Sequence, residues 1–183
     1  IVMEQFDVER QADIDRARRE QPRGVQHLID QATTRAARPG AGWNWAFYEP
    51  YVALALEYDV PLLAANLANA DTRRIVRGGL AASFDDKRLA ALGLDRPIAV
   101  AWQQAQEREL DRGHCGALPV AVWPRMAQAQ FARDAVMADV LRRQAHRGAV
   151  LLAGNGHVRR DLGVPRWLGD EAPPDELNRL SRS

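Results

Sequence analysis

The sequence predicts an α/β protein, with a largely parallel sheet flanked by helices and a small helical subdomain. Short apolar runs at 1–6, 60–65 and 149–153 each adjoin a segment with helical periodicity. Because these runs do not alternate with polar residues, they are typical of parallel strands covered on both faces. No such run occurs between 68 and 120. We therefore expect an α/β domain over 1–67 and 121–183, with a helical insertion over 68–120.

The segments between the predicted strands contain helix signals in order. Asp7 is suited to the N-cap of a charged helix that ends near Glu20, before Pro22. Further helices are expected over 25–37, 50–58, 71–80, 85–91, 97–112 and 123–147. Gly148 is expected to close the last of these. A turn is expected at 39–42, and the chain is expected to fray after Leu168.

Composition excludes several classes of protein. The chain has 183 residues, of which 46% are hydrophobic and 27% charged, as in soluble globular proteins. No apolar run approaches the roughly 18–20 residues of a membrane span, so no transmembrane segment is expected in this chain. A net charge of +1 gives no electrostatic reason to expect a nucleic-acid partner. The single cysteine, Cys115, cannot form an internal disulfide.

The N-terminal residues lead directly into the first predicted strand. Ile1 is not an initiator methionine, and a buried strand rarely begins a natural protein. We therefore expect further chain upstream of Ile1, so a signal peptide remains possible.

Three polar residues lie at the expected carboxyl ends of strands: Glu4, Asn66 and His157. Ligands of open parallel sheets bind beyond these ends, so the three are predicted to converge. Gly154 and Gly156 allow a tight turn that presents His157 at the N-terminus of a short helix, where a neutral imidazole is favoured as metal ligand or general base. A structural turn with a half-exposed histidine explains the pattern equally well.

Two further groups have a functional and a structural interpretation. His114 and Cys115 share a glycine-flanked loop, either as metal ligand and nucleophile or as an inert loop. On the last long helix, Met126, Gln130, Arg133 and Met137 recur at helical spacing beside Asp134. That face either lines a pocket or anchors the helix.

Several longer motifs occur together and in order. They are V-M-E-Q-F-D-x-x-R-Q at 2–11, W-x-W-x-x-Y-x-P at 43–50, V-P-L-L-A-A-N-L at 60–67, G-H-C-G at 113–116, M-A-Q-A-Q-x-x-R-D-A-x-M-A at 126–138 and L-L-A-G-N-G-H-V-R-R-D-x-G-V-P at 151–165. With these motifs the chain resembles the ChaN-like haem-binding uptake family of the Tiki/TraB/erythromycin-esterase-like superfamily.

The resemblance implies haem, with its iron, as cofactor, shared across a homodimer. In the family a tyrosine of one subunit holds the iron, and a histidine of the other holds the propionates. It assigns Tyr48 as the iron ligand and places Glu4 and His157 in the polar site. The matched motifs add His114 to the candidate ligand-binding residues, and Arg159 and Arg160 as partners of the propionates.

The chain departs from the family pattern at both ends. A strand that ends in a G-E-x-H-like motif normally precedes the match at Val2, and no such motif is present, so we expect it upstream of Ile1. If a signal peptide or lipobox also precedes it, the protein is an extracytoplasmic, membrane-attached lipoprotein. The family's C-terminal strand after 165–168 is not evident either.

Three functions are compatible with this sequence. The first is a haem- or iron-binding protein for iron acquisition. The alternative is an esterase-like or metal-dependent hydrolase in which Glu4 and His157 hold a metal or activate water, although no G-x-S-x-G elbow is present. The third is an interaction module that dimerises through the aromatic segment 43–58.

Overall fold

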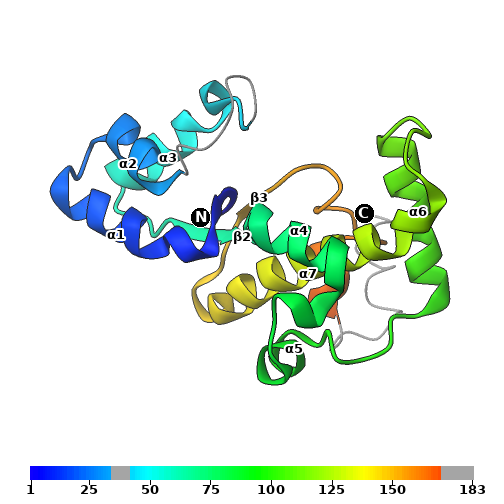
Figure 1. The fold of residues 1–183 in the computed structure, drawn as a ribbon. Coiled ribbons are helices and arrows are strands. Elements are labelled where there is room, and N and C mark those ends of the chain that lie inside the picture. Colours follow the sequence, from blue (N-terminus) through cyan, green and yellow to red (C-terminus); the bar gives the residue numbers. More distant parts are fainter. Residues whose placement is uncertain (34–41, 170–183) are drawn as a thin grey trace, which may run out of the picture. The chain divides into compact units, whose positions relative to one another are not determined.

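The computed structural model describes residues 1–33 and 42–169, which divide into two compact units. The first unit comprises 1–68 and 143–153, and the second comprises 69–142 and the chain from 154 onward. Each unit is described by itself below, with the elements labelled as in Figure 1. The expected turn at 39–42, the end of the helix predicted over 25–37 and the frayed C-terminus fall wholly or mostly outside the described residues.

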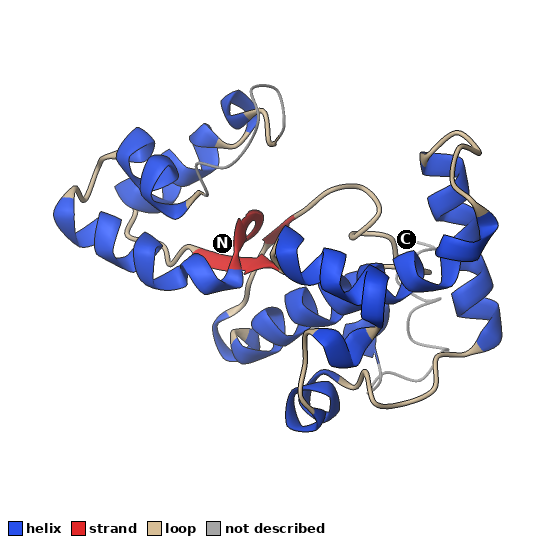
Figure 2. Ribbon diagram, viewed as in Figure 1, coloured by secondary structure: helices blue, strands red, loops and turns tan. Residues whose placement is uncertain are grey.

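The first unit contains a three-stranded parallel sheet (Figure 2), which confirms the predicted α/β fold. Its strands are β1 (Val2–Asp7), β2 (Leu63–Asn66) and β3 (Leu151–Leu152), in the order β2-β1-β3. Both outer strands are shorter than the apolar runs that predicted them. In β2 the pairing starts only after Pro61, which has no N–H to donate to a neighbouring strand.

Strand β1 contains an irregularity beside the polar residues of the unit. From Met3 to Asp7 it advances four residues, while β2 advances two, from Ala64 to Asn66. The shift brings Met3 and Phe6 into one hydrophobic core, although strict alternation would place them on opposite faces. The strand continues to Asp7, so the prediction that Glu4 ends the strand is wrong: Glu4 lies within it.

The helices of this unit are α1 (Gln11–Glu20), α2 (Val25–Ala32) and α3 (Glu49–Glu57). They contribute to a core with the sheet, whose members include Ile14, Ala17, Leu28, Val52, Ala55 and Leu56. The expected cap at Asp7 is not formed, because a 3-10 turn precedes α1 and the Asp7 carboxylate accepts a hydrogen bond from Asn66 Nδ2 at 2.8 Å.

A glutamine of α1 holds the helix against β2. The Gln11 side chain donates to the Leu62 carbonyl at 3.0 Å, and its Oε1 accepts from the Ala64 N–H at 2.8 Å. An amide side chain thereby pairs with strand backbone as a neighbouring strand would.

The second unit is helical in the described residues. It contains α4 (Asn69–Gly78), α5 (Asp86–Leu92), α6 (Val100–Gly113), α7 (Trp123–Arg143) and α8 (Val164–Leu168). Although one long helix was predicted over 123–147, α7 ends at Arg143, and a 3-10 turn at Ala145–Arg147 ends at Gly148 with φ +72°. Such tightening is common where a helix ends. The predicted domains, an α/β domain over 1–67 and 121–183 and a helical insertion over 68–120, stay a prediction.

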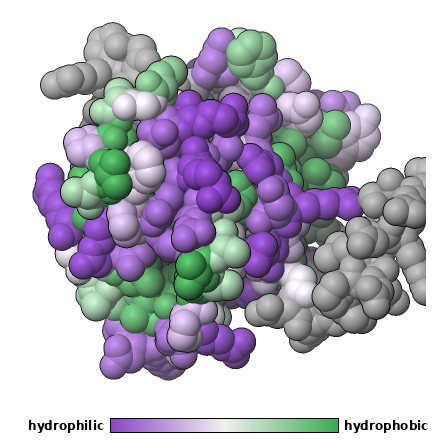
Figure 3. Space-filling model, turned by 90° about the vertical axis from the view of Figure 1, so that its right-hand side faces the viewer, coloured by the Kyte–Doolittle hydropathy of each residue, from purple (hydrophilic) through white to green (hydrophobic). Residues whose placement is uncertain are grey.

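The surface of the described residues is largely polar on the face in Figure 3, where hydrophobic side chains form separate small patches among hydrophilic ones. None of the helices in the described part of the chain is long and apolar enough to cross a lipid bilayer.

Candidate functional site

His157 lies in the second unit, in a turn that follows β3. Its N–H donates to the Gly154 carbonyl at 2.9 Å, and its own carbonyl accepts from the Val164 N–H at 2.8 Å. The latter bond folds the chain back on itself, so the prediction that His157 begins a helix is wrong: the next helix, α8, begins at Val164. The residue is only 4% exposed, which differs from the half-exposed histidine of the structural alternative.

The imidazole of His157 is held by two polar residues of α7. Its Nδ1 lies 2.5 Å from Oδ1 of Asp134, and the Gln130 amide nitrogen lies 3.1 Å from Nδ1 and 3.3 Å from Nε2. Asp134 and Gln130 are one helical turn apart and therefore project from the same face of α7. A buried carboxylate on one ring nitrogen fixes the orientation of the imidazole.

The sequence left open whether the helix face that carries Gln130 and Asp134 lines a pocket or anchors the helix. The i, i+4 spacing of Gln130 and Asp134 on an alanine-rich helix was the available signal. It could not identify their partner, because His157 is more than twenty positions away along the chain.

A glycine packs directly against the histidine turn. A Cβ on Gly163 would lie 2.2 Å from the carbonyl oxygen of His157 and 2.8 Å from that of Gly156. Both atoms belong to the backbone and cannot move aside as a flexible side chain would. The turn that positions His157 therefore requires glycine at 163.

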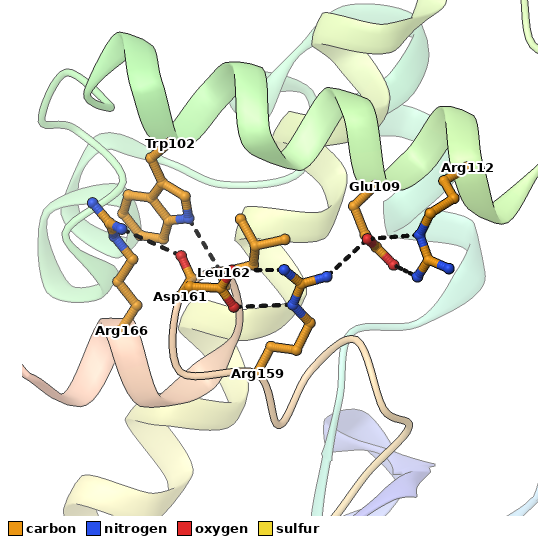
Figure 4. Close-up of polar contacts among 7 residues, drawn as sticks. All are labelled: Trp102, Glu109, Arg112, Arg159, Asp161, Leu162 and Arg166. Carbon is orange, nitrogen blue, oxygen red and sulfur yellow. Dashed lines mark hydrogen bonds and ion pairs between the residues drawn. The ribbon is translucent and has the colours of Figure 1, made fainter. Parts of the chain in front are cut away.

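Arg159 is engaged by two carboxylates (Figure 4). Its Nε and Nη2 donate to Asp161 at 2.9 and 2.6 Å, and its Nη1 donates to Glu109 of α6 at 2.8 Å. The hydrogen bond from Arg159 lowers the pKa of Asp161, and hydrogen bonds from Arg112 and Arg159 lower the pKa of Glu109. Arg160 is exposed, and the described residues contain no ion-pair or hydrogen-bond partner for its side chain.

Helix α6 makes three further contacts with the segment that follows His157, and Figure 4 shows Trp102 beside Leu162 and Arg166. Trp102 Nε1 donates to the Leu162 carbonyl at 3.2 Å, and the Arg166 guanidinium lies 4.4 Å from the centre of the Trp102 ring. Trp102 also packs against Trp167 of α8, with ring centroids 5.1 Å apart. Together with Arg159–Glu109, these contacts fasten the segment to α6.

Acidification is expected to loosen this attachment. Asp161 and Glu109 have lower pKa values folded than unfolded, so their contribution to stability is present above the unfolded values, near pH 4, and is lost as pH falls through the folded ones. Unfolding by urea between pH 6 and pH 2.5 should show a smaller loss in Arg159→Met than in the unaltered protein. The difference should be modest, since these groups are partly exposed. If both proteins lose the same free energy of unfolding on acidification, the ion pairs of Arg159 with Asp161 and Glu109 do not cause the loss.

The other predicted strand-end residues lie in the first unit. Glu4 is 2% exposed, and Asn66 is 8% exposed and hydrogen-bonded to Asp7. Next to Glu4 in the chain, both polar atoms of the Gln5 amide are buried and have no hydrogen-bond partner among the described residues. Such a group costs free energy unless something satisfies it, and sequence reasoning did not single it out. The convergence of Glu4 and Asn66 with His157 stays a prediction.

Tyr48 lies at the start of α3, among aromatic rings. Its ring contacts those of Trp43 and Trp45, with centroids 5.4 and 6.2 Å away, and packs against the core of the first unit. Its hydroxyl has no hydrogen-bond partner within 1–33 and 42–169. The ring is thus held in place by packing while its oxygen makes no such bond.

His114 is exposed at the end of α6, and its Nδ1 lies 2.7 Å from the Leu110 carbonyl oxygen. Cys115 next to it is also exposed and has a positive φ of 54°. The described residues contain no group of three or more His, Cys, Asp or Glu that could hold a metal ion. Within 1–33 and 42–169, His114 is therefore not part of a cluster of three such ligands.

The fold and these residues define an α/β protein with a buried histidine–carboxylate pair. A sequence profile of the family "Haem-binding uptake, Tiki superfamily, ChaN" matches residues 1–168, so the chain belongs to this family. Among solved structures, one titled "Cofacial heme binding to ChaN of Campylobacter jejuni" has a similar fold, with a TM-score of 0.67 and 19% sequence identity. The match covers 92% of this chain and 61% of that one, so this chain spans less than two thirds of its length. No curated protein matches the sequence significantly.

Proposed function

We propose that this protein binds haem and serves iron acquisition. The family match over residues 1–168 carries the proposal. The chain also offers side chains of the chemistry that haem requires: a phenol as iron ligand and a guanidinium for a propionate. The hydrolase alternative is not favoured by either comparison.

Tyr48 is the residue proposed to hold the iron. Bound haem supplies a ferric centre that accepts an oxygen ligand, and tyrosinate serves in this way in other haem proteins. The Trp43 and Trp45 rings that flank Tyr48 provide flat apolar surface suited to a porphyrin. The absence of a hydrogen bond at the Tyr48 hydroxyl among the described residues supports this role.

Propionates require positively charged or N–H groups. Arg160 is the better candidate, because its guanidinium has no partner in the described parts of the chain, whereas Arg159 would have to exchange Asp161 or Glu109 for a propionate. His157, oriented by Asp134, is proposed to donate from its ring to a propionate. The buried Gln5 amide would gain a partner if the ligand's polar groups reach it together with Glu4.

A homodimer that shares haem is part of the proposal. Phe47, Tyr51 and Leu54 are between 44% and 70% exposed, and they lie on or beside the part of α3 that follows Tyr48. Exposed hydrophobic residues gathered in this way are typical of surfaces that bind a partner. Light scattering on the protein with and without hemin tests this part: a monomer in both conditions would contradict it.

Titration with hemin tests the proposed function. We expect a saturable shift of the Soret band at micromolar hemin. Tyr48→Phe retains the packed ring and removes only the ligand oxygen, so it should weaken binding at least about tenfold, which corresponds to about 1.4 kcal/mol, and change the spectrum of the ferric complex.

Tyr58→Phe is the matched control, since Tyr58 is an exposed tyrosine at the other end of α3. It should bind hemin as the unaltered protein does. Equal weakening by both substitutions would refute the assignment of Tyr48. A protein that gives no spectral change with hemin would refute haem binding itself.

A further inference from the structure

A cavity of about 310 Å³ lies wholly within the second unit, among α6, α7 and the loop between α5 and α6. Its apolar lining consists of Leu80, Leu94, Pro97, Ile98 and Phe131, and its polar lining of Arg96, Gln103 and Gln128. The volume is at the lower end of the range of about 300–1,000 Å³ that small-molecule sites occupy. Since it is too small to enclose a haem, any ligand it takes differs from that of the proposed function.

The polar side chains of the cavity each retain one unused hydrogen-bonding atom. Gln128 Oε1 accepts from Arg125 at 3.0 Å, which leaves its amide N–H groups for a ligand. Gln103 donates to Glu107 at 2.7 Å, which leaves Oε1 as an acceptor. An apolar wall beside an unused amide donor is typical of a site that orients a ligand with a polar, hydrogen-bond-accepting end.

The charge of the lining is positive. Arg96 lines the cavity, its side chain is exposed, and it has no ion-pair partner within the residues that the structure describes. Arg125 adds a second guanidinium beside Gln128, while the nearby Glu107 carboxylate is bonded to Gln103. Asp95 precedes Arg96 but does not contribute to the lining. An anionic group is therefore favoured at the edge of the cavity, where Arg96 reaches solvent.

We propose that this cavity binds a small aliphatic monocarboxylate. The hydrocarbon chain packs against the apolar lining, and the carboxylate pairs with Arg96 and accepts a hydrogen bond from the Gln128 amide. A purely aliphatic ligand would cover these polar groups without bonding to them, and an inorganic anion would leave the apolar wall in water. A molecule with both parts meets the apolar side chains, Arg96 and the Gln128 amide, while Gln103 Oε1, which can only accept, takes no part in the contact.

Sodium octanoate is a suitable probe, with NMR of the side-chain amides as the readout. We expect saturable shifts of the Gln103 and Gln128 amide resonances and a dissociation constant on the order of 0.1–1 mM. Arg96→Gln should weaken binding about two- to fivefold, the effect of one exposed ion pair. Acetate, which lacks the chain, should give no saturable shift, and 1-octanol, which lacks the charge, should bind more weakly.

Matched variants distinguish binding in the cavity from nonspecific binding at the protein surface. Arg73→Gln removes an exposed arginine of α4 that does not line the cavity, and should leave octanoate binding unchanged. Ile98→Trp should fill the cavity and abolish binding. The proposal is overturned if octanoate leaves both glutamine amides unshifted, or if Ile98→Trp binds octanoate normally. It is also overturned if Arg96→Gln binds octanoate, and the unaltered protein binds 1-octanol, as tightly as the unaltered protein binds octanoate. Hemin binding should be unchanged in Arg96→Gln, so failure here and failure of haem binding are distinguishable.

Discussion

Asp134→Ala is expected to lower the free energy of unfolding by about 1–3 kcal/mol, because it removes a buried hydrogen-bond partner of the His157 ring. The His157 and Asp134 side chains are 5% and 1% exposed, and their Nδ1 and Oδ1 atoms are 2.5 Å apart. Alanine leaves the imidazole beside a gap that water cannot easily reach. Urea unfolding monitored by circular dichroism measures the loss.

Two controls sharpen this test. Asp95→Ala removes an exposed carboxylate of the same unit, and should change stability by no more than about 0.5 kcal/mol. Asp134→Asn retains the shape and one acceptor, so it should cost less than alanine. If Asp134→Ala and Asp95→Ala unfold at the same urea concentration, the His157–Asp134 pair does not stabilise the fold.

Gly163→Ala should destabilise the protein by about 1–3 kcal/mol through overpacking. The added Cβ would lie 2.2 Å from the carbonyl oxygen of His157, so the turn must shift and the hydrogen bond from the Val164 N–H must lengthen. If the proposed role of His157 holds, hemin affinity should fall as well. Denaturant unfolding and hemin titration of the same sample measure both effects.

Gly156→Ala is the matched control, because a Cβ on Gly156 meets no atom within 4 Å. It should leave stability unchanged or raise it slightly by restricting the unfolded chain. The two substitutions make the same chemical change in one turn and differ only in the space around the new methyl group. If both destabilise equally, the close approach at Gly163 is not the cause.

Local pattern was sufficient for the secondary structure but not for its details. The apolar runs located all three strands, and proline, glycine and helical periodicity located the long helices, because these signals act over a few neighbouring residues. The placement of Glu4 at a strand end was wrong because β1 continues to Asp7, which pairs with Asn66 of β2 from a distant part of the chain. The helix expected after His157 was wrong because Val164 bonds back to the His157 carbonyl.

The candidate site, too, was predictable from the sequence only in part. The sequence by itself singled out His157, Glu4, Tyr48 and the arginines 159 and 160, and its motifs determined the family to which the chain belongs. Only the tertiary structure decided that Asp134 and Gln130 hold His157, that Arg159 is already paired with Asp161 and Glu109, and that the Gln5 amide is buried unbonded. Residue type and spacing record what a side chain can do. Its partner depends on contacts between segments far apart in the chain, which spacing along the sequence does not encode.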